Sequence, residues 1–193
     1  MKVKKTDQRS RYTQFTIRKS LLYLLTKKTL KDISVTELCK TAQITRGSFY
    51  NHFYDVLDVY DSIEQEFIDQ LKERVDSTDV THLDNKFIFE IIQLIYDNYD
   101  LISVLVGDFK DTMLFEKVYE FAREKYISEF VAKCPDIDSS KIKMVFTYIV
   151  NGSMGLLIEW IESGMAKTCK VISEEISGFA RVLCNAYFGE KLN

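Results

Sequence analysis

The sequence predicts an all-α protein. One proline and seven glycines among 193 residues leave few positions that would break a helix. The alternation of polar and apolar residues that marks a strand is scarce. With 46% of its residues hydrophobic, the chain can also bury a substantial core. We therefore expect a three-helix head at residues 1–54 and a larger helical body at residues 55–193.

The first helix is expected over residues 7–28. Its apolar residues are Phe15, Ile17, Leu21, Leu24 and Leu25. We expect this helix to lie across the two short helices that follow it, with Ile33 covering its end.

The next segment, residues 34–53 with the sequence SVTELCKTAQITRGSFYNHF, predicts two short helices joined by a tight turn. Ser34 and Glu37 form an S-x-x-E capping box, so a helix should begin directly after Ser34. Thr45 can cap a second helix over residues 46–52. Two short helices with a turn of three or four residues form a helix-turn-helix unit.

The charge of the chain is divided unevenly. Residues 1–53 hold 12 Lys and Arg against 3 Asp and Glu, a formal charge of +9, whereas residues 54–193 carry a formal charge of −12. A basic first part on an acidic body is expected when the first part faces a polyanion. The alternative is a solvated lysine-rich tail, but the charges continue through an amphipathic pattern. Together with the helix-turn-helix unit, the charge predicts a head that binds DNA.

The rest of the chain is predicted to be a set of longer helices. Asp55 can cap a helix over residues 56–75, which we expect to link head and body. The polar segment at residues 76–82 interrupts the periodicity and predicts a loop and a domain boundary. Further helices are expected at residues 83–99, 101–107, 112–133, 139–164 and 173–189.

The last two long helices are predicted to form a homodimer interface. The first of them is apolar nearly all round, and the second carries an apolar stripe at helical spacing. Two such helices from each subunit can pack as a four-helix interface. The alternative is that both helices belong only to the core of their own chain. The residues expected at the interface are Gly152, Gly155, Ile176, Phe179, Leu183 and Tyr187.

The body is rich in aromatic residues, and some of them can line a pocket for a small molecule. The alternative for each is a place in the ordinary core. Asn151 lies in the most apolar helix, where its amide needs a partner in an effector, a second subunit or its own chain. The residues expected at the pocket are Tyr96, Phe109, Phe121, Phe146, Asn151 and Trp160.

Several other classes of protein are not indicated. The sequence has no G-x-S-x-G, no phosphate-binding glycine loop and no paired carboxylates with a nearby base, so we expect no enzymatic activity. The four cysteines show no metal-ligand spacing, so they indicate neither a zinc site nor a disulfide framework. We expect no cofactor. The N-terminus has no apolar stretch for a signal peptide, and the longest apolar tract, residues 144–158, is too short to span a bilayer. We expect a cytoplasmic protein without a membrane partner.

The segment IRKSLLYLLTKKTLKDISVTELCKTAQITRGSFYNHFYDVLDVYDSI closely resembles the N-terminal domain of TetR-family transcriptional regulators. Further along, GLLIEWIESG resembles a branch of the family that includes regulators of dihydroxyacetone kinase operons. The resemblance implies a sequence-specific DNA-binding regulator, a repressor released by a small-molecule effector. Its expected partners are double-stranded operator DNA, a second copy of the chain and the effector.

The resemblance also assigns roles within the head. Gly47 would let the backbone approach DNA closely. The phosphate contacts would come from Thr36, Tyr50 and His52. The major groove would meet Thr45, Arg46, Ser48 and Asn51. These types of residue suit those roles, because hydroxyls hold phosphate oxygens, Arg can bind guanine and Asn can bind adenine. For Tyr50 the alternative is packing, and for His52 it is a local cap.

Two positions depart from the family pattern. Gln43 stands where a turn glycine is usual, and it can adopt the left-handed conformation at a cost of about 1 kcal/mol. Val56 stands where a lysine commonly contacts a phosphate. The basic N-terminal residues, Lys4 and Lys5 among them, can replace that contact. Because of Val56, the alternative function is a co-regulator that acts by binding another protein, with weak or no direct binding to DNA.

Overall fold

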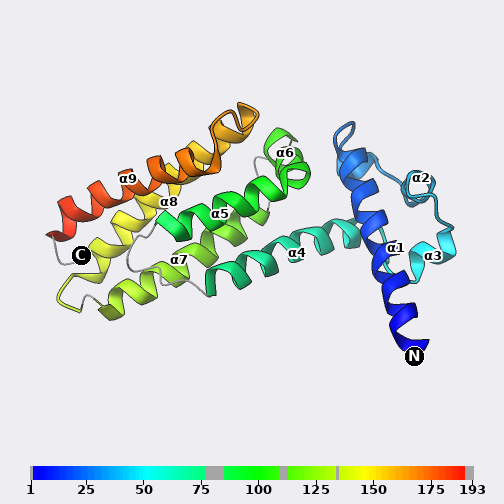
Figure 1. The fold of residues 1–193 in the computed structure, drawn as a ribbon, viewed down its shortest axis with the longest axis horizontal. Helices are drawn as coiled ribbons and strands as arrows, with labels where there is room; N and C mark the ends of the chain where they lie inside the picture. The colour runs from blue at the N-terminus through cyan, green and yellow to red at the C-terminus, as the bar shows by residue number, and fades with distance from the viewer. Residues whose placement is uncertain (1, 77–84, 109–112, 134, 190–193) are drawn as a thin grey trace. The chain divides into compact units, whose positions relative to one another are not determined.

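The computed structural model describes residues 2–76, 85–108, 113–133 and 135–189 (Figure 1). Within these ranges every regular element is a helix, which confirms the predicted all-α class. Contacts divide the chain into two compact units, Met1–Phe67 and Ile68–Asn193. Helix α4 (Val56–Asp76) begins in the first unit and ends in the second.

The first unit contains the helix-turn-helix. Its other elements are α1 (Lys2–Leu25), the 3₁₀ turn η1 (Leu30–Asp32), α2 (Val35–Thr41) and α3 (Arg46–Tyr50). Helix α1 packs on α2, and α2 packs on α3.

Helix α1 begins at Lys2 and ends at Leu25, earlier at both ends than predicted. The residues that it buries along one side are Ile17, Leu21, Leu24 and Leu25. Phe15, the other apolar residue named for this helix, has a side chain that is 59% exposed. Two positions before Ile17, a residue points to nearly the opposite side of an α-helix, so Phe15 cannot share the buried side.

The capping box at α2 is only half formed. The Ser34 hydroxyl accepts the backbone N–H of Glu37 at 3.2 Å, which confirms the predicted start of the helix at Val35. The Glu37 carboxylate does not reach back to Ser34. It accepts a hydrogen bond from the Lys28 ammonium at 2.6 Å. In this pair both the donor and the acceptor are charged, whereas a backbone amide would offer a neutral donor.

The turn between α2 and α3 is tight. Gln43 adopts a left-handed φ of 54°, as its replacement of the usual glycine predicted. The Thr45 hydroxyl then accepts the backbone N–H of Ser48 at 3.1 Å and caps α3. Helix α3 ends at Tyr50, two residues before the predicted end, and Asp55 begins α4 by accepting the N–H of Asp58 at 2.8 Å.

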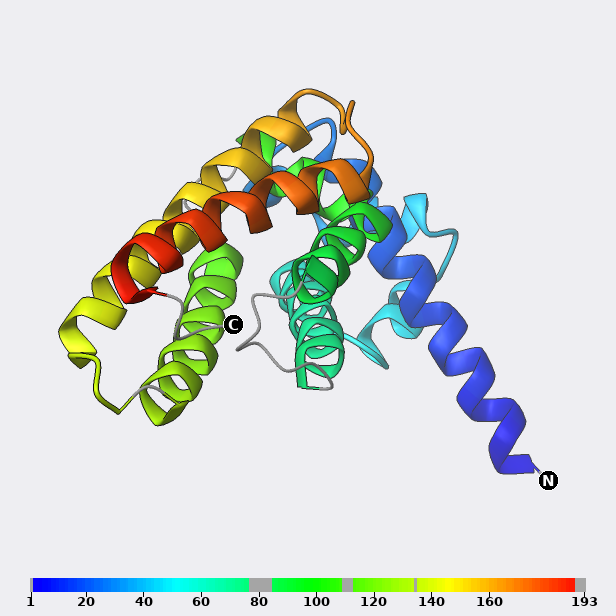
Figure 2. The same ribbon diagram turned by 60° about the vertical axis from the view of Figure 1, so that its left-hand side comes forward.

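The second unit is a bundle of helices that also includes the C-terminal part of α4 (Figures 1 and 2). The other helices are α5 (Asn85–Asp97), α6 (Tyr99–Asp108), α7 (Met113–Lys133), α8 (Ser139–Glu162) and α9 (Cys169–Phe188). Helices α8 and α9 run antiparallel and pack together, while α5 packs on α9 and both α6 and α7 pack on α8 (Figure 2). The predicted loop at residues 76–82, apart from Asp76, lies outside the described residues.

Helix α9 begins at Cys169, four residues before the predicted start at residue 173. Thr168 caps it, because its hydroxyl accepts the N–H of Val171 at 3.4 Å. The indole N–H of Trp160 donates to the carbonyl of Lys167 at 2.9 Å and so fixes the connection between α8 and α9. These two bonds order the link between α8 and α9, where the sequence predicted an interruption between residues 164 and 173.

Helix α8 passes a length and composition test for a membrane span. It also packs against three helices of the second unit, α6, α7 and α9, as the core helix of a bundle does. Only 28% of its most apolar window is buried within the single chain. The large apolar residues of α8 that remain exposed are Met144, at 56%, and Tyr148, at 69%.

Candidate nucleic-acid interface

The predicted DNA-binding residues form an exposed polar surface around α3. Phe49 is fully buried and Phe53 is 6% exposed, so these two aromatic rings hold the segment against the core of the first unit. The opposite side of the segment is open to solvent. The predicted residues that are exposed are Thr36, Thr45, Arg46, Gly47, Tyr50 and Asn51, and those that are half-buried are Ser48 and His52. Eight of the ten predicted residues are therefore open or partly open to solvent, and the side chains of the other two, Lys4 and Lys5, lie outside the described residues.

Arg46 and Tyr50 are joined to each other. The Arg46 Nη2 donates to the Tyr50 hydroxyl at 3.1 Å, and the guanidinium carbon lies 5.8 Å from the centre of the Tyr50 ring. The hydrogen bond to Tyr50 raises the pKa of Arg46 from its ordinary value. The sequence analysis treated the two residues separately. Their i, i+4 spacing is the signal that would have paired them.

Gly47 has no steric neighbour that requires a glycine. A Cβ added at Gly47 would meet the Thr45 hydroxyl at 3.9 Å, an ordinary contact. Any need for glycine at this position would come from a molecule outside the protein, and close approach to DNA stays a prediction.

The basic residues of α1 differ in what the structure describes of them. Lys4 and Lys5 belong to α1, but their side chains lie outside the described residues. Arg18, further along α1, donates to Ser62 at 3.0 Å and to Glu66 at 2.5 Å, so it ties α1 to α4. Arg18 is thus committed to the protein's own structure.

Val56, where the family often has a lysine, is 8% exposed. It is the first residue of α4 and belongs to the core of the first unit. Its side chain therefore stabilises the junction after the helix-turn-helix by apolar packing.

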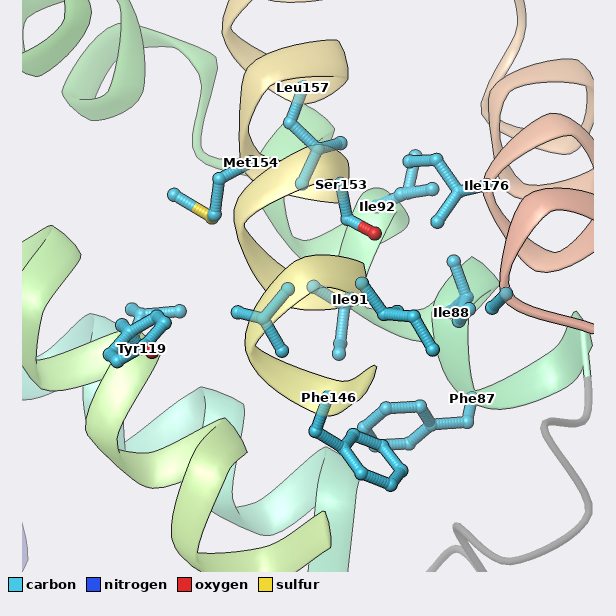
Figure 3. Close-up of a pocket in the computed structure, with 14 residues that line it drawn as sticks. Phe87, Ile88, Ile91, Ile92, Tyr119, Phe146, Ser153, Met154, Leu157 and Ile176 are labelled. Atoms are coloured by element: carbon cyan, nitrogen blue, oxygen red, sulfur yellow. The ribbon is translucent and has the colours of Figure 1, made fainter. Parts of the chain in front are cut away.

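The body contains an apolar cavity of about 100 Å³ between α5, α7, α8 and α9 (Figure 3). Of the residues predicted to line a pocket, Phe146 is found there. Phe109 lies outside the described residues. Tyr96 is 51% exposed and Phe121 is half-buried, and neither lines this cavity.

Trp160 and Asn151 are also absent from the lining of this cavity. Trp160 is buried and uses its N–H to hold the α8 to α9 link. Asn151 is exposed, and its amide donates to the carbonyl of Thr147 at 2.7 Å within the same helix. Of the three alternatives for the amide of Asn151, this bond is the one within its own chain. Ile88 and Ile91 of α5 also line the cavity, and a prediction based on aromatic residues missed them. Their i, i+3 spacing indicates a shared side of the helix and is the signal that could have found them.

The residues predicted for the dimer interface divide into exposed and buried members. Phe179 is 62% exposed and Tyr187 is 45% exposed, and both glycines are exposed as well. Leu183 is half-buried. Ile176 is 3% exposed and packs within its own chain, where it lines the cavity. Additional exposed apolar residues on the same two helices are Met144, Tyr148, Val171 and Val182.

Residues 85–181 match the TetR_C_8 family model, which describes a transcriptional regulator C-terminal region. The chain belongs to the TetR family of transcriptional regulators. The match covers most of the second unit, whereas the resemblance read from the sequence rested on the first. TetR-family regulators bind DNA and typically form dimers.

Several solved structures share this fold. A TetR-family regulator from Syntrophomonas wolfei matches with a TM-score of 0.69 and 17% identity, over 90% of this chain and 95% of that one. The dihydroxyacetone kinase operon activator DhaS matches with a TM-score of 0.61 and 15% identity, over 91% and 97%. The fatty acid degradation regulator FadR from Bacillus halodurans matches with a TM-score of 0.65 and 14% identity, over 87% and 94%. No curated protein sequence matches the chain.

Proposed function

We propose that this transcriptional regulator represses its target genes by binding a specific operator as a homodimer, and that a small molecule bound in the body releases it. The observation that carries the proposal is the exposed polar surface around α3, held in place by the buried rings of Phe49 and Phe53.

Within that surface we assign Arg46 and Asn51 to base edges in the major groove and Thr36, Tyr50 and His52 to phosphates. Arg can bind guanine through two hydrogen bonds, and Asn can bind adenine in the same way. Phosphate contacts set the register of a protein on the duplex, and they add a salt-dependent part to the affinity.

The homodimer is supported by the apolar residues that one chain leaves exposed on α8 and α9. Tyr148, Phe179 and Val182 are 69%, 62% and 68% exposed. Contiguous exposed apolar surface of this kind marks an interaction site. A symmetric dimer would present two heads to two half-sites about 34–36 Å apart, or a multiple of that distance.

The release by an effector is supported by the connections of α4. Its first part is tied to α1 by the ion pair between Arg18 and Glu66. Its last part is tied to α5 by Arg74, whose guanidinium lies 3.0 Å from Asp97 and 3.6 Å from Glu90. Helix α5 also lines the cavity in the body. A ligand that shifts α5 would therefore shift α4, and a displacement of a few ångströms would spoil the match to successive major grooves.

DNA selection from a random pool tests the first part of the proposal. We expect an enriched palindromic sequence, bound with an affinity that falls steeply with salt. A reporter gene under that sequence should be repressed in the presence of the protein. If no sequence is enriched and binding to DNA is weak at low salt, the co-regulator function suggested by Val56 becomes the better explanation.

Calorimetry tests the second part. A ligand found by thermal-shift screening is titrated into the protein with and without operator. If the ligand weakens DNA binding by some factor, operator must weaken ligand binding by the same factor. Equal ligand affinities in the two titrations would show that the body is not coupled to the head.

A further inference from the structure

We propose that the ligand of the body is a neutral, mostly hydrocarbon molecule, such as a single aromatic ring or a short alkyl chain with at most one hydroxyl. This inference deepens the proposed function and rests on it, because it names the chemical class of the effector. It is argued from the cavity between α5, α7, α8 and α9.

The lining of the cavity is almost entirely aliphatic and aromatic (Figure 3). Among the described lining residues none carries a charge, and the polar side-chain groups are the hydroxyls of Ser153 and Tyr119. Ser153 points inward between Ile92 and Ile176, and Tyr119 lies on the other side of the cavity, on α7 (Figure 3).

This lining favours a neutral ligand over an ionised one. An ionised carboxylate or ammonium that leaves water without a partner loses far more free energy than a hydroxyl does. Of the described lining groups, only two hydroxyls can form hydrogen bonds, and neither has a charge to offset that of an ion. A hydroxyl on the ligand, by contrast, can bond with Ser153.

The size of the cavity limits the ligand further. Its volume of about 100 Å³ is on the scale of an engineered apolar cavity of about 150 Å³ that stays dry and binds benzene. A single ring or a short chain therefore matches the space. Each buried methylene contributes enough transfer free energy to raise affinity about fourfold, so even a small ligand can bind measurably.

A second, wider hollow adjoins the cavity on the side of the proposed dimer interface, where Phe179 and Val182 line it. This groove of about 390 Å³ lies along α8 and α9. It shares four lining residues with the cavity: Ile149, Ser153, Ile176 and Ala180. Ser153 thus stands at the boundary of both spaces, where it can hold a ligand hydroxyl while the hydrocarbon part fills the cavity.

Three probes of similar size and different charge test the class of ligand: toluene, benzyl alcohol and benzoate. Each is titrated into the full-length protein without DNA, and binding is followed by calorimetry. We expect toluene and benzyl alcohol to bind and benzoate to bind at least about 100-fold more weakly. Benzoate that binds as tightly as benzyl alcohol would overturn the proposal, and so would a protein that binds none of the three.

Variants that fill the cavity test the position of the site. Ser153→Leu adds apolar volume at the boundary, and Val150→Phe adds it elsewhere in the lining. Two variants are used so that a folding failure in one leaves the other informative. We expect each folded variant to bind toluene at least about tenfold more weakly. The added side chain would displace apolar contact with the ligand that is worth roughly two buried methylene groups. Glu159→Leu, at an exposed position of the same helix, is the matched control and should bind toluene as the parent does. Unchanged toluene binding in the folded filling variants would place the site elsewhere and overturn the proposal.

Parallel measurements of operator binding separate this inference from the proposed function. If benzyl alcohol binds and operator affinity does not change, release by the effector fails while the class of ligand stands. If benzoate binds in the cavity and weakens operator binding, the class of ligand is wrong while release by an effector stands.

Discussion

The two units expose different chemistry on the surfaces proposed for binding. Around α3 in the first unit, the exposed side chains are hydroxyls, an amide and a guanidinium, and several are held by bonds within four residues. On α8 and α9 in the second unit, the exposed side chains include Tyr148, Phe179 and Val182, which are largely apolar. The same chain therefore carries two different surfaces. The surface around α3 is suited to a polyanion, and the surface on α8 and α9 is suited to an apolar partner.

This difference predicts opposite responses to charge. Binding to DNA depends on cations and hydrogen-bonding groups, and its affinity falls as salt rises. Association through an apolar surface depends on removing that surface from water, and it is disrupted by a buried charge. Substitutions that add or remove charge therefore distinguish the two surfaces.

The largest effect is expected for Phe179→Glu. In a homodimer built on α8 and α9, an uncompensated buried carboxylate costs about 3–5 kcal/mol, and symmetry introduces it twice. We expect light scattering to show the mass of a single chain, with the helical circular dichroism unchanged. Tyr96→Glu is the control, since Tyr96 is 51% exposed on α5 and should leave the mass unchanged. A folded Phe179→Glu protein of unchanged mass would mean that the interface lies elsewhere.

The next effect concerns Arg46 and Tyr50. Removing a base contact with Arg46→Ala should reduce discrimination at one base pair by about 1–3 kcal/mol. Tyr50→Ala removes a phosphate contact and should weaken binding to all sequences. Because Tyr50 also holds the Arg46 guanidinium, we expect Tyr50→Phe to relax part of the same discrimination.

Titrations of the selected operator and its single base-pair variants measure these losses. The double variant completes a cycle, and contacting residues are expected to be coupled by about 0.5–3 kcal/mol. Equal losses on every sequence for Arg46→Ala and Tyr50→Ala would remove Arg46 from the residues that contact bases.

A smaller effect is expected at the two helix caps. Ser34 and Thr45 each accept one backbone N–H, so Ser34→Ala and Thr45→Ala should each lower the free energy of unfolding by about 1 kcal/mol. Only Thr45 is proposed to face the major groove. Chemical denaturation should therefore give similar losses for both variants, while operator titrations should show a loss for Thr45→Ala alone. Equal losses of operator affinity would argue against a groove contact by Thr45.

The smallest effect is expected at Gln43, whose φ of 54° is unfavourable for a residue with a Cβ. Gln43→Gly removes a strain of about 1 kcal/mol but increases the conformational entropy of the unfolded chain, so the net gain should be under about 1 kcal/mol. Gln43→Val should be clearly destabilising, because a β-branched residue is a stronger outlier at positive φ. Thermal unfolding of the two variants measures the difference. Equal midpoints would contradict the strained turn.

The sequence predicted the first unit in more detail than the second. The starts of α2, α3 and α4 follow from Ser34, Thr45 and Asp55, because a cap involves groups only two or three residues apart. The left-handed turn at Gln43 was predicted from the family resemblance, because Gln43 stands where a turn glycine is usual.

The two candidate sites differ in how far the sequence could predict them. The exposed surface around α3 could be predicted because its members lie close together in the sequence. The cavity could not, since Ile88, Tyr119, Phe146 and Ile176 come from four different helices. Predicting the pocket from aromatic content alone placed Trp160 there, whereas packing gave its N–H to the carbonyl of Lys167.

By itself, the sequence determined the all-α class, the helix-turn-helix and the order of the helices, because hydrophobic periodicity and capping act between residues a few positions apart. Tertiary structure alone decided that Glu37 pairs with Lys28 and that residues of α5, α7, α8 and α9 line one cavity. Those outcomes depend on which side of each helix meets a neighbour. A helical stripe shows which residues can be buried, but only packing selects the partner and the space left between them.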